Sequence, residues 1–412
     1  MEPKLRVRDV YKIFGDNPQD ALDRLKRGQT KEEILEESGQ VVGVQDATFD
    51  VEEAHIFVVM GLSGSGKSTL VRMLNGLIKP TSGHILIDED DVASCSPEQL
   101  RRIRRNKIAM VFQHFALFPH KTIAENVGYG LKIKGVGAAE RRQKALAALD
   151  QVGLAAWADS YPSELSGGMK QRVGLARGLA TDPPILLMDE PFSALDPLIR
   201  REMQEELLGL QKKLKKTIVF ITHDLNEALM LGDRIAIMKD GRFVQVGTAQ
   251  EIVSNPADDY VAAFVADIDR GRVFTAGHVA NAPAAVQLSA SAEDALQTME
   301  ESNRTAVYVL DGEKVAGVVS YQDLSTAARG NGEAGTTLAD VLVTDYPSAV
   351  EDAQLHELYG LASTGLPVAV LDGKGRLIGV IEPEAVFAQL SGDEQTTQQE
   401  TGQSETGARA AS

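Results

Sequence analysis

A chain of 412 residues, 43% of them hydrophobic, has room for two or three domains with cores of their own. Its net charge of −17 argues against nucleic-acid binding, because neutralising phosphates requires clustered Lys and Arg. No apolar stretch approaches the roughly 20 residues that span a membrane, and MEPKLRVRDV at the start lacks the apolar core of a signal peptide. The single cysteine, Cys95, excludes an intrachain disulfide and suits a reducing compartment, so we expect a cytosolic protein.

The charge is unevenly spread along the chain. Residues 271–412 hold 7 Lys and Arg against 20 Asp and Glu, a net charge of −13, whereas residues 1–270 carry only −4. The basic run at 101–107 is an exception, and we interpret it as a solvated helix face rather than a polyanion site.

Residues 1–270 alternate short apolar runs with amphipathic stretches, which is typical of a mostly parallel α/β sheet. The charged, helix-favouring residues 20–38 interrupt the first β segment, so an insertion is predicted at about residues 16–40. Strands are predicted at Ile56–Met60, Ile108–Phe112, 185–188, Thr217–Thr222 and Arg234–Lys239.

A glycine-rich loop follows the first of these strands and precedes a predicted helix at 70–74. Its residues, which match G-x-x-x-x-G-K-[ST], are Gly61, Leu62, Ser63, Gly64, Ser65, Gly66, Lys67, Ser68 and Thr69. In this setting backbone N–H groups surround nucleotide phosphates at a helix N-terminus, Lys67 reaches the terminal phosphates, and the Ser68 hydroxyl can join a Mg²⁺ ion. The loop predicts a site for ATP or GTP.

Two carboxylates, Asp189 and Glu190, end the apolar run at 185–188. A buried parallel strand delivers its C-terminal residues to the edge of the sheet where ligands bind. We predict that Asp189 holds Mg²⁺ and that Glu190 polarises the water that attacks the γ-phosphate. The alternative, an acidic cap for a following helix, is weakened by Pro191.

A third segment, Ser166-Gly167-Gly168, lies about 100 residues beyond the glycine-rich loop and opens a predicted helix at 173–180. Its N–H groups and the positive end of the helix dipole offer a second place for phosphate.

In order and spacing, these motifs resemble the ATPase subunits of ATP-binding cassette (ABC) transporters over residues 1 to about 270, which implies a P-loop α/β domain. The resemblance supplies further site residues. Gln113 resembles the Q-loop glutamine, a further Mg²⁺ ligand, and Asp196 lies in a segment that resembles the D-loop. His223 resembles the switch histidine that contacts the γ-phosphate, and Phe14 the aromatic that stacks on adenine.

The family's mechanism implies partners for this chain. Two copies would meet head to tail, with ATP between Lys67 of one copy and residues 166–168 of the other. A transmembrane permease would provide the solute pathway, touching the segment 114–129, and an extracytoplasmic solute-binding protein or domain would deliver the solute. The ATPase would then lie at the cytoplasmic face of the inner membrane.

An internal repeat occupies residues 277–390. Asp311 and Asp372 occupy matching positions 61 residues apart, and Gly317 and Gly379 match at an offset of 62. Each copy, at about 277–330 and 337–390, has a predicted upstream helix (292–302 and 352–363). Because one copy is too small to bury its own face, the two should pack as a single α+β module. Residues 391–412 are polar and predicted to be disordered.

The phrases GLSGSGKST, IAMVFQHFALFPH, SELSGGMKQRVGLARGLA and FSALDPLIRREMQ, with the insertion and the repeat, most closely resemble the ATPases of glycine betaine/proline importers. In that family the repeat is a pair of cystathionine-β-synthase (CBS) motifs with a regulatory role. The sequence departs from the wider ABC transporter family at Ala54-His55, where that family usually has Gly-Glu. An importer of methionine, polyamines or other amino acids is the main alternative. A DNA-repair or translation ATPase would need coiled-coil inserts or a second cassette.

The first repeat also contains Ser320 and Asp323 in the pattern G-h-h-S-x-x-D, with which many CBS domains bind adenine nucleotides. The same pair resembles a helix-capping box, which we favour. A regulatory nucleotide and an anionic membrane surface both stay open as effectors of this module.

Overall fold

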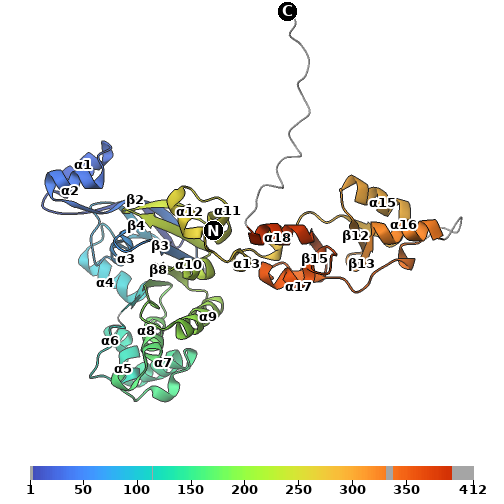
Figure 1. The fold of residues 1–412 in the computed structure, drawn as a ribbon. Helices are drawn as coiled ribbons and strands as arrows, with labels where there is room; N and C mark the ends of the chain where they lie inside the picture. Colours follow the sequence, from blue (N-terminus) through green and yellow to red (C-terminus); the bar gives the residue numbers. More distant parts are fainter. Residues whose placement is uncertain (1–2, 114, 331–336, 392–412) are drawn as a thin grey trace, which may run out of the picture. The chain divides into compact units, whose positions relative to one another are not determined.

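The computed structural model describes residues 3–113, 115–330 and 337–391. The chain forms two compact units, Met1–Asp267 and Ile268–Ser412 (Figure 1). None of the helices within the described ranges is both long and apolar enough to cross a bilayer. Of the tail predicted at 391–412, only Ser391 lies inside the described residues.

The first unit is built on a six-stranded sheet. All neighbouring strands run parallel except β9 and β10. In spatial order the strands are β10 (Arg242–Gly247), β9 (Arg234–Lys239), β3 (Ile56–Met60), β8 (Thr217–Thr222), β7 (Ile185–Asp189) and β6 (Ile108–Phe112). Every residue of β3, β7 and β8 is buried, as expected for parallel strands that are covered on both faces. The predicted α/β class is confirmed, and β7 is one residue longer than predicted because it includes Asp189.

A second, antiparallel sheet packs against the first. Its strands, in spatial order, are β2 (Val41–Val51), β1 (Leu5–Phe14), β4 (Ser82–Ile87) and β5 (Asp90–Asp91). The two sheets share one hydrophobic core, in which the rings of Phe49 and Phe57 stack with centroids 4.6 Å apart. This core fixes β1 and β2 relative to the loop that follows β3.

Between β1 and β2 the chain folds into two helices, α1 (Pro18–Lys26) and α2 (Lys31–Ser38), drawn in blue in Figure 1. They have a small core with Ile13 and Val42 of the flanking strands. Thr30 and Glu33 form a capping box at the start of α2. Lys31 pairs with Asp240 in the turn between β9 and β10, which ties this helix pair to the main sheet.

The other helices of the first unit cover the sheets or form a helical lobe, shown at the bottom of Figure 1. The lobe contains α5 (Ile123–Val127), α6 (Tyr129–Ile133), α7 (Ala138–Gln151) and α8 (Gly167–Ala180), with the short helices η1 (Ala155–Trp157) and η2 (Pro162–Glu164). The remaining helices are α3 (Lys67–Leu74), α4 (Pro97–Asn106), α9 (Pro197–Leu214), α10 (Leu225–Leu231), α11 (Ala249–Ser254) and α12 (Asp259–Val265).

The turn before β3 holds Ala54 in the left-handed region, at φ 62°. This conformation costs an L-residue other than glycine about 1–2 kcal/mol. We predict that Ala54→Gly raises the free energy of unfolding by up to about 1 kcal/mol, as measured by urea titration. As a control, Ala147→Gly at an exposed position of α7 should lower it by about 1 kcal/mol. A loss of stability in Ala54→Gly would show that the turn is not strained.

The second unit contains two copies of one small α+β motif. Both sheets have the same order, a parallel pair followed by an antiparallel hairpin. The first copy contains β11 (Ala285–Gln287), α15 (Ala292–Glu301), β12 (Ala306–Asp311), β13 (Lys314–Ser320) and α16 (Tyr321–Gly330). The second contains β14 (Ser348–Val350), η4 (Leu355–Leu358), α17 (Tyr359–Ala362), β15 (Val368–Leu371), β16 (Leu377–Ile381) and α18 (Pro383–Ser391). The rest are α13 (Arg270–Val273), α14 (Ala276–Val279) and η3 (Leu338–Asp340). The helix predicted at 352–363 is thus split into η4 and α17.

The two copies exchange their leading segments. Val343, which precedes β14 of the second copy, bridges to Val318 in β13, and Asn281, which precedes β11 of the first copy, bridges to Val380 in β16. Each of these bridged segments passes close over the glycine that occurs in both copies, Gly317 in the first and Gly379 in the second. A Cβ at Gly317 would lie 2.5 Å from the Val343 carbonyl oxygen, and one at Gly379 would lie 2.7 Å from Ala280 Cβ. These close approaches explain why glycine occupies the same place in both copies.

The interface between the copies is a joint core around Tyr308, which is 1% exposed. The Tyr308 hydroxyl donates to the Pro367 carbonyl oxygen at 2.5 Å, and burial raises the pKa of this phenol. Nearby, Arg304 Nη1 of the first copy lies 2.7 Å from Glu382 Oε1 of the second. The copies therefore form one module, as their small size requires.

Candidate functional site

The polar residues singled out in the first unit gather at one edge of the six-stranded sheet. The phosphate loop, residues 61–69, follows β3, and Asp189 ends β7. His223 follows β8 and Gln113 follows β6. These four strands are parallel and occupy neighbouring places in the sheet, so their C-terminal ends meet at the edge where ligands bind in such folds.

The last turn of the phosphate loop leaves no room for a side chain at Gly66. Gly66 has φ 103°, and a Cβ there would lie 2.4 Å from the Gly43 carbonyl oxygen. The helix α3 begins at the next residue, so its free N–H groups and its dipole point into the loop. This arrangement suits an anion such as a nucleotide phosphate.

Lys67 points back into the loop and is 4% exposed. Its ammonium group donates to the carbonyl oxygens of Gly61 at 2.8 Å and Leu62 at 2.9 Å. Burial lowers the pKa of Lys67, while the nearby Glu190 and Asp189 carboxylates oppose the shift. Phosphate oxygens could replace these carbonyl contacts and supply the negative charge that this buried cation lacks.

Asp189 and Ser68 form an oxygen-rich corner beside Lys67. The Ser68 hydroxyl donates to Asp189 Oδ1 at 3.1 Å, and Asp189 is 8% exposed. Burial raises the pKa of Asp189, against the hydrogen bond from Ser68. Within the described ranges no group of three or more His, Cys, Asp and Glu side chains could hold a metal. A hydroxyl and one carboxylate nevertheless suit Mg²⁺ that arrives with nucleotide phosphates, because such ions keep few protein ligands.

Glu190 and His223 face each other across the ends of β7 and β8. Glu190 Oε2 lies 3.0 Å from His223 Nδ1, with the carboxylate side chain 19% exposed and the imidazole 54% exposed. Glu190 has φ 46°, an uncommon conformation for a non-glycine residue that often occurs at functional sites. A carboxylate held in this way can accept a proton from a water molecule at the edge of the sheet.

Sequence reasoning missed a hydroxyl that links two of these residues. Gln113 Nε2 donates to Ser193 Oγ at 3.0 Å, and Ser193 Oγ donates to the Glu190 carbonyl oxygen at 3.0 Å. Ser193 thereby connects the strand ends of β6 and β7. The sequence signal was its place three residues after Glu190, at the start of the segment Ser193–Asp196 that resembles the D-loop.

A buried polar network beneath His223 was also missed. Glu227, 6% exposed, accepts hydrogen bonds from Thr222 and from Gln204 Nε2, the latter at 2.8 Å. Burial raises the pKa of Glu227. Thr222 also accepts from the backbone N–H of Asp224 at 3.0 Å, so the network holds the chain on both sides of His223.

Other predicted residues lie apart from the phosphate loop. Ser166 caps α8 and accepts from the Met169 N–H at 3.3 Å, and Asp196 caps α9 in the same way. Among the described residues no hydrogen bond joins residues 166–168 to the phosphate loop. Phe14, at the end of β1, is 40% exposed, and Lys12 Nζ lies 4.9 Å from its ring centroid. The helix α8, which Ser166 caps, lies in the helical lobe, apart from α3, which follows the phosphate loop (Figure 1).

In the second unit, Ser320 and Asp323 form hydrogen bonds with each other. The Asp323 N–H donates to Ser320 Oγ at 3.1 Å, and the Ser320 hydroxyl donates to Asp323 Oδ2 at 2.7 Å. This is the geometry of a helix cap at the start of α16, the interpretation favoured from the sequence.

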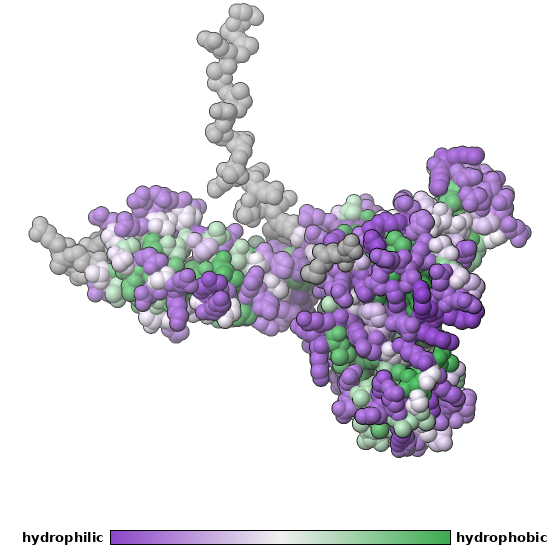
Figure 2. Space-filling model, turned by 180° about the vertical axis from the view of Figure 1, so that it is seen from behind, coloured by the Kyte–Doolittle hydropathy of each residue, from purple (hydrophilic) through white to green (hydrophobic). Residues whose placement is uncertain are grey.

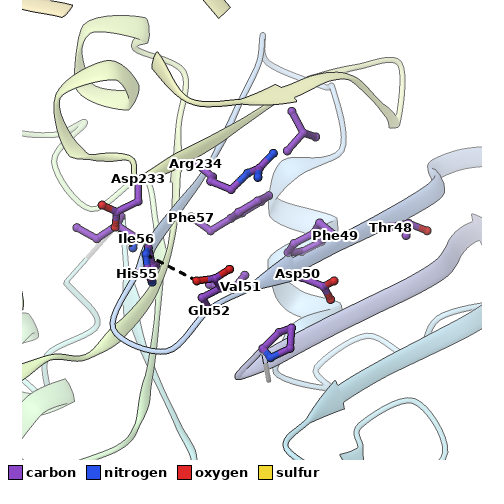
Figure 3. A pocket seen from close by; sticks show the side chains of 12 residues that line it. Thr48, Phe49, Asp50, Val51, Glu52, His55, Ile56, Phe57, Asp233 and Arg234 are labelled. Atoms are coloured by element: carbon purple, nitrogen blue, oxygen red, sulfur yellow. Dashed lines mark hydrogen bonds and ion pairs between the residues drawn. The ribbon is translucent and has the colours of Figure 1, made fainter. Parts of the chain in front are cut away.

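A cavity of about 620 Å³ lies at the opposite edge of the six-stranded sheet (Figure 3). It is bounded by the end of β2 and the starts of β3 and β9, and on one wall His55 Nε2 lies 4.0 Å from Glu52 Oε2. None of the residues predicted to bind the nucleotide lines this cavity.

The fold, together with the residues at the C-terminal ends of β3, β8, β7 and β6, defines the class of the first unit, a P-loop nucleotide hydrolase.

Comparisons with known proteins agree with this class. A family model described as ABC transporter matches residues 44–193, and one described as CBS domain matches residues 276–330. The chain is 50% identical over 392 residues to the glycine betaine transport ATP-binding protein OpuAA of Bacillus subtilis, which covers 95% of this chain and 93% of that relative. It is 49% identical over 396 residues to the glycine betaine/proline betaine transport system ATP-binding protein ProV of Salmonella typhimurium, covering 95% and 98%.

A solved structure gives the same result for the fold. A dimeric ATP-binding cassette in a post-hydrolysis state, bound to ADP and Pi, is 33% identical, with a TM-score of 0.51, covering 60% of this chain and 98% of that chain. The chain therefore belongs to the ABC transporter ATPases, in the glycine betaine/proline betaine class with C-terminal CBS domains. It is an ATP hydrolase, and the resemblance stated from the motifs is confirmed.

Proposed function

We propose that this chain couples ATP binding and hydrolysis to the import of a compatible solute of the glycine betaine or proline betaine type. The observation that carries the proposal is the identity of about one half, along 95% of the chain, to relatives named for that transport. A permease spans the membrane, an extracytoplasmic protein or domain delivers the solute, and this subunit is peripheral, at the cytoplasmic face of the inner membrane.

A solute panel tests the assignment. The chain is assembled with its permease in lipid nanodiscs, and ATP hydrolysis is measured with each candidate solute. We expect glycine betaine or proline betaine to stimulate hydrolysis. Stimulation by methionine or a polyamine instead would support the alternative importers and overturn the assignment.

The site residues have distinct roles in the proposed reaction. Lys67 and the loop N–H groups bind the phosphates of ATP, and Phe14 stacks on adenine. Mg²⁺ would be held by Ser68, Gln113 and Asp189, and when bound it neutralises phosphate charge. Glu190 accepts the proton of the attacking water, and His223, held by Glu190, contacts the γ-phosphate.

The composite site requires two copies of the chain. We infer that Ser166, Gly167 and Gly168 of one copy close over ATP on the phosphate loop of the other, with Asp196 near the dimer contact. The separation of these motifs within one copy supports this arrangement, as does the similarity to a dimeric cassette. ATP then stabilises the closed dimer, and hydrolysis releases it.

A groove of about 460 Å³ beside the helical lobe suits the permease. It is lined by apolar side chains, among them Leu77, Phe112 and Ile133, and by four arginines. The basic residues are Arg101, Arg104, Arg105 and Arg177. Arg177 also donates to the carbonyl oxygens of Phe115 and Ala116 at 2.9 and 2.6 Å, which joins the groove to the segment predicted to touch the permease. His114 of that segment lies outside the described residues. We propose that an amphipathic cytoplasmic helix of the permease binds here.

The second unit has the charge of a regulatory module that responds to salt. Residues 271–412 carry −13, yet hydrophobic side chains, drawn in green, also lie on its surface (Figure 2). The large exposed hydrophobic side chains of this unit include Tyr359, Val350 and Phe387, at 59%, 55% and 41% exposed. Electrostatic contacts of so acidic a unit, with a membrane surface or with other subunits, change as ions screen them over about 8 Å at physiological salt.

We predict that truncation after Asp267 leaves ATP hydrolysis in place but removes the normal dependence of transport on ionic strength. The change follows because the truncated chain loses −13 of the net charge of −17. Glycine betaine uptake is measured in vesicles over a series of internal salt concentrations, with the full chain in parallel. An unchanged salt threshold would remove the sensor proposal, and an equal loss of uptake at every salt concentration would assign the unit to dimer stability alone.

A further inference from the structure

His223 depends for its position on the residues on either side of it. Its side chain is half-exposed, and its Nδ1 lies 3.0 Å from Glu190 Oε2. The preceding residue, Thr222, ends β8 and pairs with Met60, the last residue before the phosphate loop. The following residue, Asp224, caps α10. Because His223 is the single residue between them, the backbone at Thr222 and Asp224 determines where its side chain starts.

A closed set of hydrogen bonds joins these two residues to Glu227 of α10. The buried Thr222 hydroxyl donates to Glu227 Oε2 and accepts from the Asp224 N–H at 3.0 Å. The Glu227 N–H donates in turn to Asp224 Oδ1 at 3.3 Å. The Glu227 carboxylate therefore holds the hydroxyl that holds the backbone after His223.

The helix α9 contacts both members of this set. Gln204 Nε2 donates to Glu227 Oε1 at 2.8 Å, and both side chains are buried. Arg200 lies one helical turn earlier on the same face of α9, and its Nη1 is 3.4 Å from Asp224 Oδ2. Burying a glutamate and a glutamine is costly unless both are hydrogen-bonded, and here their hydrogen bonds lead to the residues that flank His223.

We propose that Glu227 is a positioning residue for ATP hydrolysis, acting through Thr222 to hold His223 at the γ-phosphate. Gln204 keeps the Glu227 carboxylate oriented. The inference rests on the function proposed above, in which His223 contacts the γ-phosphate. Glu227 is buried and bonded to Thr222 and Gln204, so it acts through these residues and not on ATP itself. A residue that must contact a reacting group within a fraction of an ångström needs such support from its neighbours.

Thr222→Val tests the proposal, because it keeps the branched shape and removes only the hydroxyl. In the assembled transporter kcat should fall by about tenfold to 100-fold, since a misplacement of about 1 Å can cost about 10²-fold. The KM for ATP should stay at the wild-type value, because the phosphate loop is untouched. The matched control is Thr217→Val at the other end of β8. Thr217 is 1% exposed, against 2% for Thr222, and also accepts a backbone N–H at 3.0 Å, that of Ala54. Its turnover should stay near the wild-type rate.

Two substitutions of Glu227 give an independent test. Glu227→Gln can still accept from Gln204 and can donate to the Thr222 hydroxyl, so its turnover should stay close to the wild-type rate. Glu227→Leu can form neither hydrogen bond and should lose as much turnover as Thr222→Val. Equal rates in the two Glu227 variants would overturn the proposal.

His223→Ala separates this inference from the function on which it rests. Single-turnover phosphate release should show that His223→Ala/Thr222→Val is no slower than His223→Ala alone, because the hydroxyl then has no imidazole to position. A further drop in the double variant, or a wild-type rate in Thr222→Val, would overturn the positioning role while the proposed function stands. Equal losses in Thr222→Val and Thr217→Val, with a parallel fall in Tm, would overturn it as well. Normal hydrolysis by His223→Ala would instead overturn the role proposed for His223, and this inference with it.

Discussion

Glu190→Gln should bind ATP with unchanged affinity and hydrolyse it at least about 100-fold more slowly, because a general base contributes about 10²–10⁴ in rate. The amide preserves the shape of the side chain and can still accept from His223, which lies 3.0 Å away. Lys67, Ser68 and Asp189 keep their contacts, so the phosphates and Mg²⁺ should bind as before. Phosphate release from the assembled transporter measures turnover, and gel filtration with ATP should show a trapped dimer.

Glu206→Gln provides a matched control for this prediction. Its carboxylate is 20% exposed, close to the 19% of Glu190, but it pairs with Arg172 at 3.3 Å and lies outside the predicted site. Turnover in this control should stay near the wild-type rate. Hydrolysis by Glu190→Gln at a comparable rate would show that Glu190 is not the base.

Ser166→Arg should abolish hydrolysis while leaving ATP binding to the single chain intact. The exposed Ser166 caps α8 of the helical lobe, and a bulky cation there would block the approach of the partner copy. Loss of the cap itself costs only about 1 kcal/mol. Ser96→Arg removes an equivalent cap from α4 and controls for that cost. ATP affinity, dimerisation and phosphate release are measured for both variants.

Mixed dimers make the same prediction sharper. A dimer of one Ser166→Arg copy and one Lys67→Ala copy keeps one complete site, because the intact Lys67 and the intact Ser166 belong to different subunits and face each other. A dimer of one double mutant and one wild-type copy carries the same substitutions but has no complete site. We expect ATP to close the first dimer more tightly than the second. Equal behaviour would show that residues 166–168 do not face nucleotide.

The sequence predicted the parts of the first unit that depend on local pattern. Ile56–Met60, Ile108–Phe112, Thr217–Thr222 and Arg234–Lys239 have the predicted bounds, because each contains an uninterrupted apolar run. Asp189 was assigned to the position after its strand, yet it belongs to β7. In β7 the Asp189 carboxylate accepts a hydrogen bond from Ser68. The two residues are 121 positions apart, so the local sequence around Asp189 does not predict this contact.

The sequence pattern did not predict contacts between segments that are far apart along the chain. The hydrogen bond from Gln113 to Ser193 spans 80 positions, and the contact of Lys31 with Asp240 spans 209. The repeat was visible from its matching Asp and Gly residues, but the exchange of leading segments across Gly317 and Gly379 was not. Such contacts depend on how the elements pack, which residue pattern alone does not specify.

The most direct measurement of the central claim is ATP-driven solute uptake. The chain and its permease are reconstituted in vesicles with ATP on the side of this subunit, and retention of radiolabelled glycine betaine is followed with the solute-binding partner outside. The account predicts uptake that requires ATP and disappears in Glu190→Gln, with proline betaine as a competitor. Vigorous ATP hydrolysis without betaine accumulation, or accumulation that persists in Glu190→Gln, would contradict it.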